Sequence, residues 1–220
     1  MGTSRNFSIT GDIHGKVGPV VFTTWKGVNV VRSAPEPPNK SKTTKKQAKE
    51  RSAFKSVQEF VSSMPIELIR IGYQLPRKAK KTASNLAFAY HRLHALIGDA
   101  APFDIDLSKV KFTQPINLTA GAWNVKLAFP TPDQAVISWE LNPFPQQHTQ
   151  PDDLAFVIFY EKTVKRFFTE YVTRDELSVS FSYPKGKKPY SDRNMFCWIF
   201  FTSADYKKVS HTKYLGNFIL

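Results

Sequence analysis

Cysteine is almost absent from this chain, which has one, Cys197, among its 220 residues. A single thiol can form neither an intramolecular disulfide framework nor the ligand set of a zinc finger. Cys197 alternates with aromatic neighbours in a β-like stretch. We therefore expect it to be a small buried or half-buried residue and not a nucleophile.

Long apolar runs are also missing. No stretch approaches the roughly 20 apolar residues that a transmembrane helix needs. The first residues lead into Gly11, Asp12 and His14 instead of the apolar core of a Sec signal peptide. We expect a cytoplasmic location or export by a non-Sec route. Hydrophobic residues still make up 41% of the sequence, enough to build a core, which excludes wholesale disorder.

A nucleotide-binding loop is not present either. The segment that begins at Gly11 has glycines and a lysine, as a phosphate loop does. However, three residues instead of four separate Gly11 from Gly15, and Val17 follows Lys16 where a hydroxyl would have to meet Mg²⁺. These glycines indicate turns and close backbone packing.

Residue clusters that would hold a metal or perform catalysis are incomplete. His91 and His94 are three apart on a predicted helix but have no carboxylate partner nearby in the sequence. Asp104 and Asp106 lack the further oxygen ligands of a calcium loop. No hydrolase, kinase or β-lactamase motif is visible. We predict that the protein has no cofactor and no metal and is not an enzyme.

Acidic residues are scarce relative to basic ones. Asp and Glu number 18 and Lys and Arg 31, which gives a net charge of +13. Residues 1–114 hold 19 basic and 8 acidic side chains, whereas residues 115–220 hold 12 and 10. The positive charge therefore belongs to the N-terminal half. Basic clusters attract polyanions because binding releases condensed counterions.

The densest basic stretch falls on the start of a predicted helix, where cations oppose the helix dipole by about 0.3–1 kcal/mol each. A sequence selected for stability alone would place acidic residues there, so this placement favours a polyanionic partner. A solvated, solubilising surface is the alternative. The predicted polyanion contacts are Lys40, Lys42, Lys45, Lys46, Lys49, Arg51, Lys78, Lys80 and Lys81.

The first part of the chain resembles a small β unit. Residues 20–25 are β-branched and aromatic, a turn at Gly27 follows, and residues 28–32 return, which is typical of a hairpin. An isolated hairpin is marginal in water, so we expect it to pack on something else. Phe22 and Trp25 would form either a base-stacking platform or an anchor to the helices.

Residues 43–98 have the apolar spacing of helices. Thr44 and Gln47 make a capping box, and Gly72 and Gly98 are stop signals. The apolar stripe of the first helix comprises Phe54, Val57, Phe60, Val61 and Met64. This pattern predicts three helical segments.

From about residue 109 the period changes to two, which predicts seven strands. They are 124–129, 134–141, 154–160, 165–172, 177–183, 195–202 and 209–219. Seven short strands indicate an immunoglobulin- or fibronectin-like sandwich, and we expect its core to contain Trp139, Phe156, Ile158, Trp198 and Phe200. The prediction is an α+β protein with a basic hairpin-and-helix region at 1–108 and a β-sandwich at 109–220.

Several short segments, in order, cover nearly the whole chain. They are 15–18, 25–27, 30–35, 44–47, Arg51 with Phe54, 71–73, 85–91, 103–106, 108–110, 138–139, 201–205 and 209–216. Together they resemble domain of unknown function 6266, an uncharacterised family of Bacteroidota proteins. The resemblance implies a basic Gly-rich N-terminal segment, a helical middle and a C-terminal β-sandwich, and it implies no activity or catalytic residue.

These observations predict a non-enzymatic binding or assembly module. Its basic half would contact a polyanion, nucleic acid first, through phosphates and without sequence readout. The alternative is a structural subunit of a phage-like, filament or surface assembly that self-associates through its N-terminal segment and its last strand. A third possibility is an enzyme whose site lies between helices and sandwich, and a concave pocket with converging titratable groups would favour it.

Overall fold

The structure is a computed structural model, and it describes residues 3–4, 13–25, 28–35, 43–76, 80–131, 134–144, 149–183 and 193–219. The chain forms two compact units, residues 1–44 and 45–220. The sequence pattern suggested a boundary after residue 108. The structure instead keeps the helices and the sandwich in one unit, because they share one hydrophobic core.

The first unit is a four-stranded antiparallel sheet in the order β1-β2-β3-β4. Its strands are β1 (Thr3–Ser4), β2 (Ile13–Val17), β3 (Val20–Trp25) and β4 (Val28–Ser33). Strands β3 and β4 are the predicted hairpin. Phe22 and Trp25 are three residues apart on β3 and therefore lie on opposite faces of the sheet, so they do not form one stacking platform. No side chain that the structure describes in this unit is buried.

The second unit begins with the helices α1 (Lys45–Ser63), α2 (Ile66–Gly72) and α3 (Ala83–His94). Helix α1 begins directly after Thr44, as predicted. Helix α3 is capped by Thr82, whose hydroxyl accepts a hydrogen bond from the Asn85 amide at 3.1 Å. This helix ends at His94 and not at Gly98, because β5 (Leu96–Ile97) turns back to pair with β6 (Asp104–Ile105).

Seven strands follow, close to the predicted ranges. They are β7 (Trp123–Thr131), β8 (Gln134–Glu140), β9 (Leu154–Glu161), β10 (Arg166–Thr173), β11 (Ser178–Ser182), β12 (Asn194–Thr202) and β13 (Lys213–Ile219). One sheet has the order β10-β9-β12-β13 and the other β11-β8-β7, and all pairings in them are antiparallel. The protein is thus of mixed α+β class.

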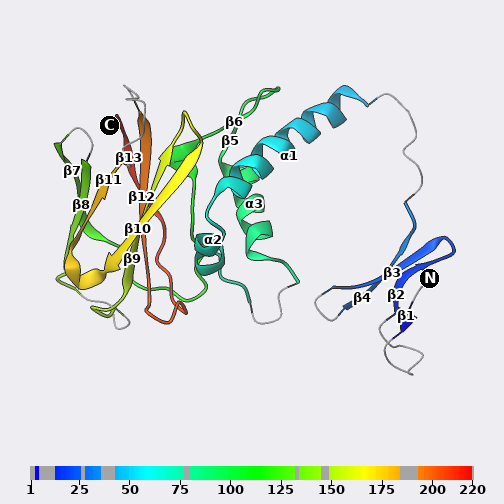
Figure 1. Cartoon of the computed structure of the whole chain (residues 1–220), viewed down its shortest axis with the longest axis horizontal. Helices are drawn as coiled ribbons and strands as arrows, with labels where there is room; N and C mark the ends of the chain where they lie inside the picture. Colours follow the sequence, from blue (N-terminus) through cyan, green and yellow to red (C-terminus); the bar gives the residue numbers. More distant parts are fainter. Residues whose placement is uncertain are drawn as a thin grey trace. The chain divides into compact units, whose positions relative to one another are not determined.

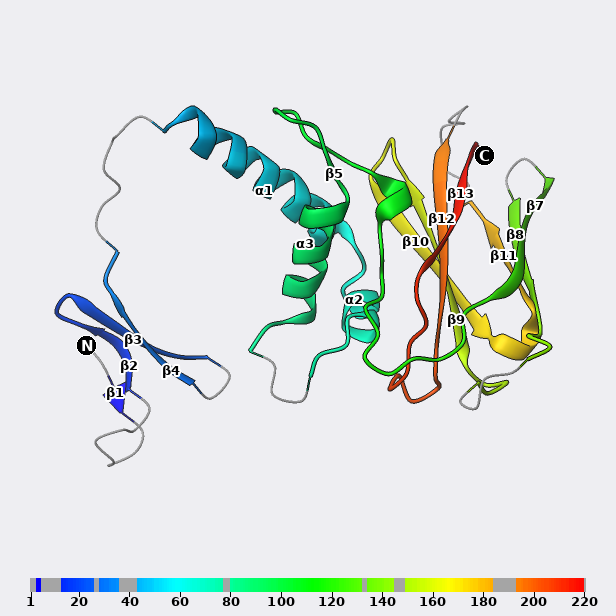
Figure 2. The ribbon, with the colours of Figure 1, turned by 180° about the vertical axis from the view of Figure 1, so that it is seen from behind.

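The second unit has three layers (Figures 1 and 2): the helices, the four-stranded sheet and the three-stranded sheet. Strands β9 and β12 are buried on both faces. One face of β9 carries Val157 and Phe159 into the core between the sheets, and the other carries Ile158 and Tyr160 into the core beneath the helices. Because successive side chains of a strand alternate, one strand serves two cores.

This arrangement corrects the predicted sandwich core. Trp139 does lie between the two sheets. Phe156, Ile158, Trp198 and Phe200 instead face the helices. Nearly every residue of β9 and β12 is buried, so both faces of these strands are apolar in the sequence. The sequence therefore could not show which face packs against the helices and which against the other sheet.

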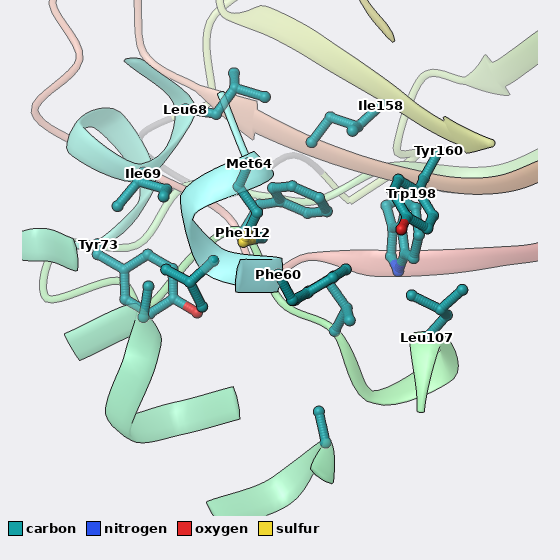
Figure 3. Packing of buried hydrophobic residues seen from close by; sticks show 14 of the residues in the cluster. Phe60, Met64, Leu68, Ile69, Tyr73, Leu107, Phe112, Ile158, Tyr160 and Trp198 are labelled. Atoms are coloured by element: carbon teal, nitrogen blue, oxygen red, sulfur yellow. The ribbon is translucent and has the colours of Figure 1, made fainter. Parts of the chain in front are cut away.

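The core beneath the helices is aromatic (Figure 3). The ring of Phe60 on α1 meets that of Tyr160 on β9 edge to face at 5.9 Å. The ring of Phe112 meets that of Trp198 on β12 in the same manner at 5.5 Å. Helices and sheet therefore share one continuous core, which is why they form one compact unit.

Candidate functional site

The first turns of α1 carry four of the predicted polyanion contacts. Lys45, Lys46, Lys49 and Arg51 are all exposed, as is every other side chain from residue 45 to residue 51. Good helix formers such as Lys, Gln, Ala and Glu stabilise these turns by propensity instead of burial. The first turns of α1 are thus a basic helical surface. The predicted contacts Lys40, Lys42 and Lys78 lie outside the described residues.

Negative charge is scarce at this end of α1. The first turn has no acidic residue, and Glu50 forms an ion pair with Arg92 of α3. Within the described part of the chain, Lys45, Lys46 and Lys49 make no ion pair. Three ammonium groups therefore lie near the positive end of the helix dipole, where an anion would relieve their repulsion.

Lys80 and Lys81, also exposed, lie at the other end of the helix pair. They directly precede the cap of α3, and α3 runs roughly against α1: Arg92 meets Glu50, and the Phe88 ring lies 4.7 Å from the Phe54 ring. Lys80 and Lys81 therefore lie beside the C-terminal part of α1. With a rise of 1.5 Å per residue along α1, they are roughly 25 Å from Lys45 and Lys46. Among the described residues, the fold does not gather the predicted contacts into one patch but spaces them along the helices.

A cavity of about 410 Å³ opens elsewhere, between helices and sheet. Its first wall is a face of α1 with Ser56, Glu59 and Phe60, which recur at helical spacing. Its other walls are the β6 segment around Asp104 and the turn from β9 to β10 with Lys162 and Lys165. Carboxylates, ammonium groups and a tyrosine hydroxyl thus converge on one concave site. A concave pocket of this kind is what the sequence analysis names as favouring an enzyme.

The charges of this cavity are partly paired. Asp104 Oδ2 lies 3.0 Å from Lys162 Nζ, and its Oδ1 accepts a hydrogen bond from the Ile105 amide at 2.8 Å. Burial raises the pKa of Asp104, but the hydrogen bonds from Lys162 and Ile105 outweigh it and leave the pKa below its ordinary value. Asp104 is therefore ionised at neutral pH and holds Lys162 in place.

Sequence reasoning did not find this cavity. In the sequence, Asp104 is considered as a calcium ligand, Lys162 is placed in a turn, and Lys165 is placed at the start of the predicted strand 165–172. The one signal was the polar set Ser56, Glu59 and Ser63 next to the apolar stripe of α1. In the sequence alone, these residues indicate a solvated helix face. Only the tertiary structure shows that the β9–β10 turn lies on the other side of the cavity.

The two histidines of α3 do not act together. His91 is fully buried, and its Nδ1 donates to the Ala87 carbonyl at 2.7 Å. Its Nε2 accepts a long hydrogen bond, 3.4 Å, from the Lys111 amide. His94 is exposed and lies against Tyr90, with ring centroids 4.7 Å apart. His91 therefore ties α3 to the following segment.

The comparison with known families concerns almost the entire chain. Residues 12–216 match the family of unknown function DUF6266. The chain belongs to this family. No curated protein matches the sequence. In the described part of this DUF6266 member, no helix has the length and apolar character needed to cross a membrane.

Fibronectin-like folds are among the similar solved structures. The solution structure of the fn3 domain of human collagen alpha-1(XX) chain is 12% identical, covers 46% of this chain and 84% of its own, and has a TM-score of 0.34. A cytokine receptor complex is 13% identical over 54% of this chain and 55% of its own, with a TM-score of 0.30.

Proposed function

We propose that this protein is a non-enzymatic binding module whose basic helical surface contacts a linear polyanion, nucleic acid first. The observation that carries the proposal is the exposed start of α1, where Lys45, Lys46 and Lys49 have no described counter-ion. Phosphates at that position would neutralise these three lysines and would also interact favourably with the positive end of the helix dipole. The cost of keeping cations there would then be offset on binding.

The spacing of the basic groups supports an extended ligand over a small anion. Lys80 and Lys81 lie roughly 25 Å from the start of α1, and no small anion spans that distance. Duplex DNA carries a charge about every 1.7 Å along its axis and offers phosphates to both groups. Lysine ammonium groups contact phosphates without reading bases, so binding would be independent of sequence.

The seven C-terminal strands would form a fibronectin-type sandwich that supports these helices. The first, second and fifth strands, β7, β8 and β11, share one sheet, and the other four share the second. This distribution is the one expected of such a sandwich. In this proposal the sandwich fixes α1 and α3 through the aromatic core that they share.

The test is fluorescence anisotropy with a labelled duplex DNA, over about 50 to 200 mM KCl. Changing Lys45, Lys46 and Lys49 to Gln should weaken binding and reduce the slope of log K against log salt by about 0.9 for each lost phosphate contact. A matched triple variant, Lys207, Lys208 and Lys213 to Gln, removes the same charge from the sandwich. Equal slopes for the two variants would refute the proposal. Heparin as competitor separates a general polyanion from nucleic acid.

A structural subunit of a larger assembly is the second candidate. The four-stranded N-terminal sheet has no buried side chain among those described, and Val31 on it is 60% exposed. Strand β13 is an edge of its sheet and ends with Ile219, 68% exposed. Such edges and apolar faces can pair with another chain. Light scattering that shows concentration-dependent association at high salt would favour this function over the first.

A further inference from the structure

The cavity between α1 and the β9–β10 turn has the size and lining of a small-molecule site. Its volume of about 410 Å³ falls within the range of roughly 300–1,000 Å³ that ligand pockets occupy. Its floor is apolar and rigid: Phe60, Tyr160 and Leu107 are buried and belong to the core beneath the helices. Its rim is polar and charged. A rigid apolar floor with a charged rim suits an amphiphilic ligand.

The rim has one ammonium group, that of Lys165, that forms no ion pair with the described residues. Asp104 is engaged by Lys162 at 3.0 Å, and Glu59 lies 3.7 Å from Lys55 on the same helix. Lys165 makes no ion pair or hydrogen bond with the described residues, although its charge lowers the pKa of the neighbouring Asp104. Lys162 and Lys165 thus both lie near Asp104, but only Lys162 is paired with it, which leaves the ammonium group of Lys165 for a ligand.

The backbone of Lys165 has an unusual conformation. Its φ of 55° lies in the left-handed region, which a lysine rarely adopts. Lys165 lies directly before β10, and the pairing of Arg166 on β10 with Glu161 on β9 closes the hairpin. The conformation is kept by the strands on either side. The turn therefore fixes the backbone of Lys165, which lines the cavity.

We propose that this cavity binds a small organic anion, whose apolar body lies against Phe60 and Phe103 and whose acidic group meets Lys165. The Tyr160 hydroxyl makes no hydrogen bond with described residues and is available as a donor to the same ligand. Burial raises the pKa of Tyr160, so the hydroxyl keeps its proton. The acidic group is a carboxylate or a phosphate monoester, since both accept from an ammonium group.

The probes for the test are naphthoate, naphthyl phosphate and the neutral naphthol, titrated into the full-length protein by calorimetry and ligand-observed NMR. At least one anion should bind five- to tenfold or more tightly than naphthol, because a hydrogen bond to a charged group is lost in the neutral probe. The tighter of the two anions identifies the acidic group. Equal affinity for all three probes would overturn the proposal.

Two variants locate the binding. Lys165→Asn removes the charge and keeps a residue that tolerates the left-handed backbone, and it should weaken the anions about tenfold while leaving naphthol unchanged. Ser56→Trp fills the cavity from α1 and should abolish binding of all three. Lys213→Gln, on β13, is the matched control and should bind as the wild type does. Wild-type anion affinity in both Lys165→Asn and Ser56→Trp would refute the site.

This inference stands apart from the proposed polyanion function. The Lys45/Lys46/Lys49 to Gln variant lacks the basic helical surface but keeps the cavity. It should bind naphthoate or naphthyl phosphate normally while it loses DNA affinity. Loss of both activities in that variant would show that the small anions bind the basic helical surface, and would overturn the cavity site.

Discussion

The guanidinium of Arg174 lies 3.0 Å from the carboxylate of Asp153, and both side chains are buried at one end of the sandwich. Arg174 also donates to the Ala120 carbonyl at 2.7 Å, and its charged group lies 4.0 Å above the centre of the Phe201 ring. The indole Nε1 of Trp139 donates to the Arg174 carbonyl at 3.0 Å. This ion pair thus joins both sheets and the segment that leads into β7.

Arg174→Met is expected to destabilise the protein by about 3–5 kcal/mol, because it leaves the buried carboxylate of Asp153 without a counter-ion. Urea unfolding followed by tryptophan fluorescence measures the change. Adding Asp153→Asn should recover part of the loss, since the uncompensated charge is then gone. Arg70→Met is the control: its pair with Glu67 is exposed, and its loss should cost at most about 1 kcal/mol. Equal effects of the two single changes would contradict this account.

Gly72→Ala is expected to destabilise the protein by about 1–3 kcal/mol or more, because a Cβ at Gly72 would lie 2.0 Å from the Phe112 carbonyl oxygen. This close approach lets the Gln114 amide donate to the Gly72 carbonyl at 2.9 Å and attaches α2 to the segment before the sandwich. Gly121→Ala is the matched control, since its nearest neighbour, Ser210 Cβ, is 4.0 Å away. Thermal unfolding of both variants decides the question, and equal midpoints would count against it.

His91 should make the protein less stable in acid. Burial lowers its pKa from 6.5 to about 4, despite the hydrogen bond to Ala87. The unfolded chain then binds more protons than the folded one between these values. The contribution of His91 to stability is complete above pH 6.5, declines as the pH falls, and levels off below about 4, with a total loss of about 3 kcal/mol.

Unfolding free energies at several pH values between 7.5 and 4.5 test this dependence. His91→Gln cannot titrate and should have a flatter profile than the wild type in this window, whatever its absolute stability. His94→Gln, on the exposed side of α3, should keep the wild-type profile. A wild-type slope in His91→Gln would show that other groups cause the acid sensitivity.

A chain that begins at Lys45 should fold. Both hydrophobic cores are built from residues after Thr44, and the contact boundary falls there. We expect its thermal midpoint to lie within about 4 °C of that of the full chain, because a change of less than 1 kcal/mol moves the midpoint of a domain of this size by that amount. A chain that begins at residue 109 lacks α1, α2 and α3 and should be unfolded or aggregated. Cooperative folding of the second chain would contradict the shared core.

Much of the secondary structure followed from the sequence. The change of apolar period near residue 109, with turn residues between the short apolar stretches, located the seven strands. The stripe with Val57, Phe60 and Val61 located α1, and all three are buried. Phe54 belongs to the same stripe but is 52% exposed, and its ring lies 4.7 Å from that of Phe88. The local sequence pattern therefore identified the helices and strands more reliably than it identified which of their side chains are buried.

What the sequence determined by itself was three helical segments, the hairpin of β3 and β4, the seven strands of the two larger C-terminal sheets, and the exposure of the basic start of α1. These follow from period, composition and charge, which are local properties. Only the tertiary structure decided which face of β9 and β12 meets the helices, that helices and sandwich form one unit, and that Asp104, Lys162 and Lys165 meet Glu59 around a cavity. Each of these depends on contacts between residues far apart in the chain, and no local pattern encodes which distant surface a strand buried on both sides will meet.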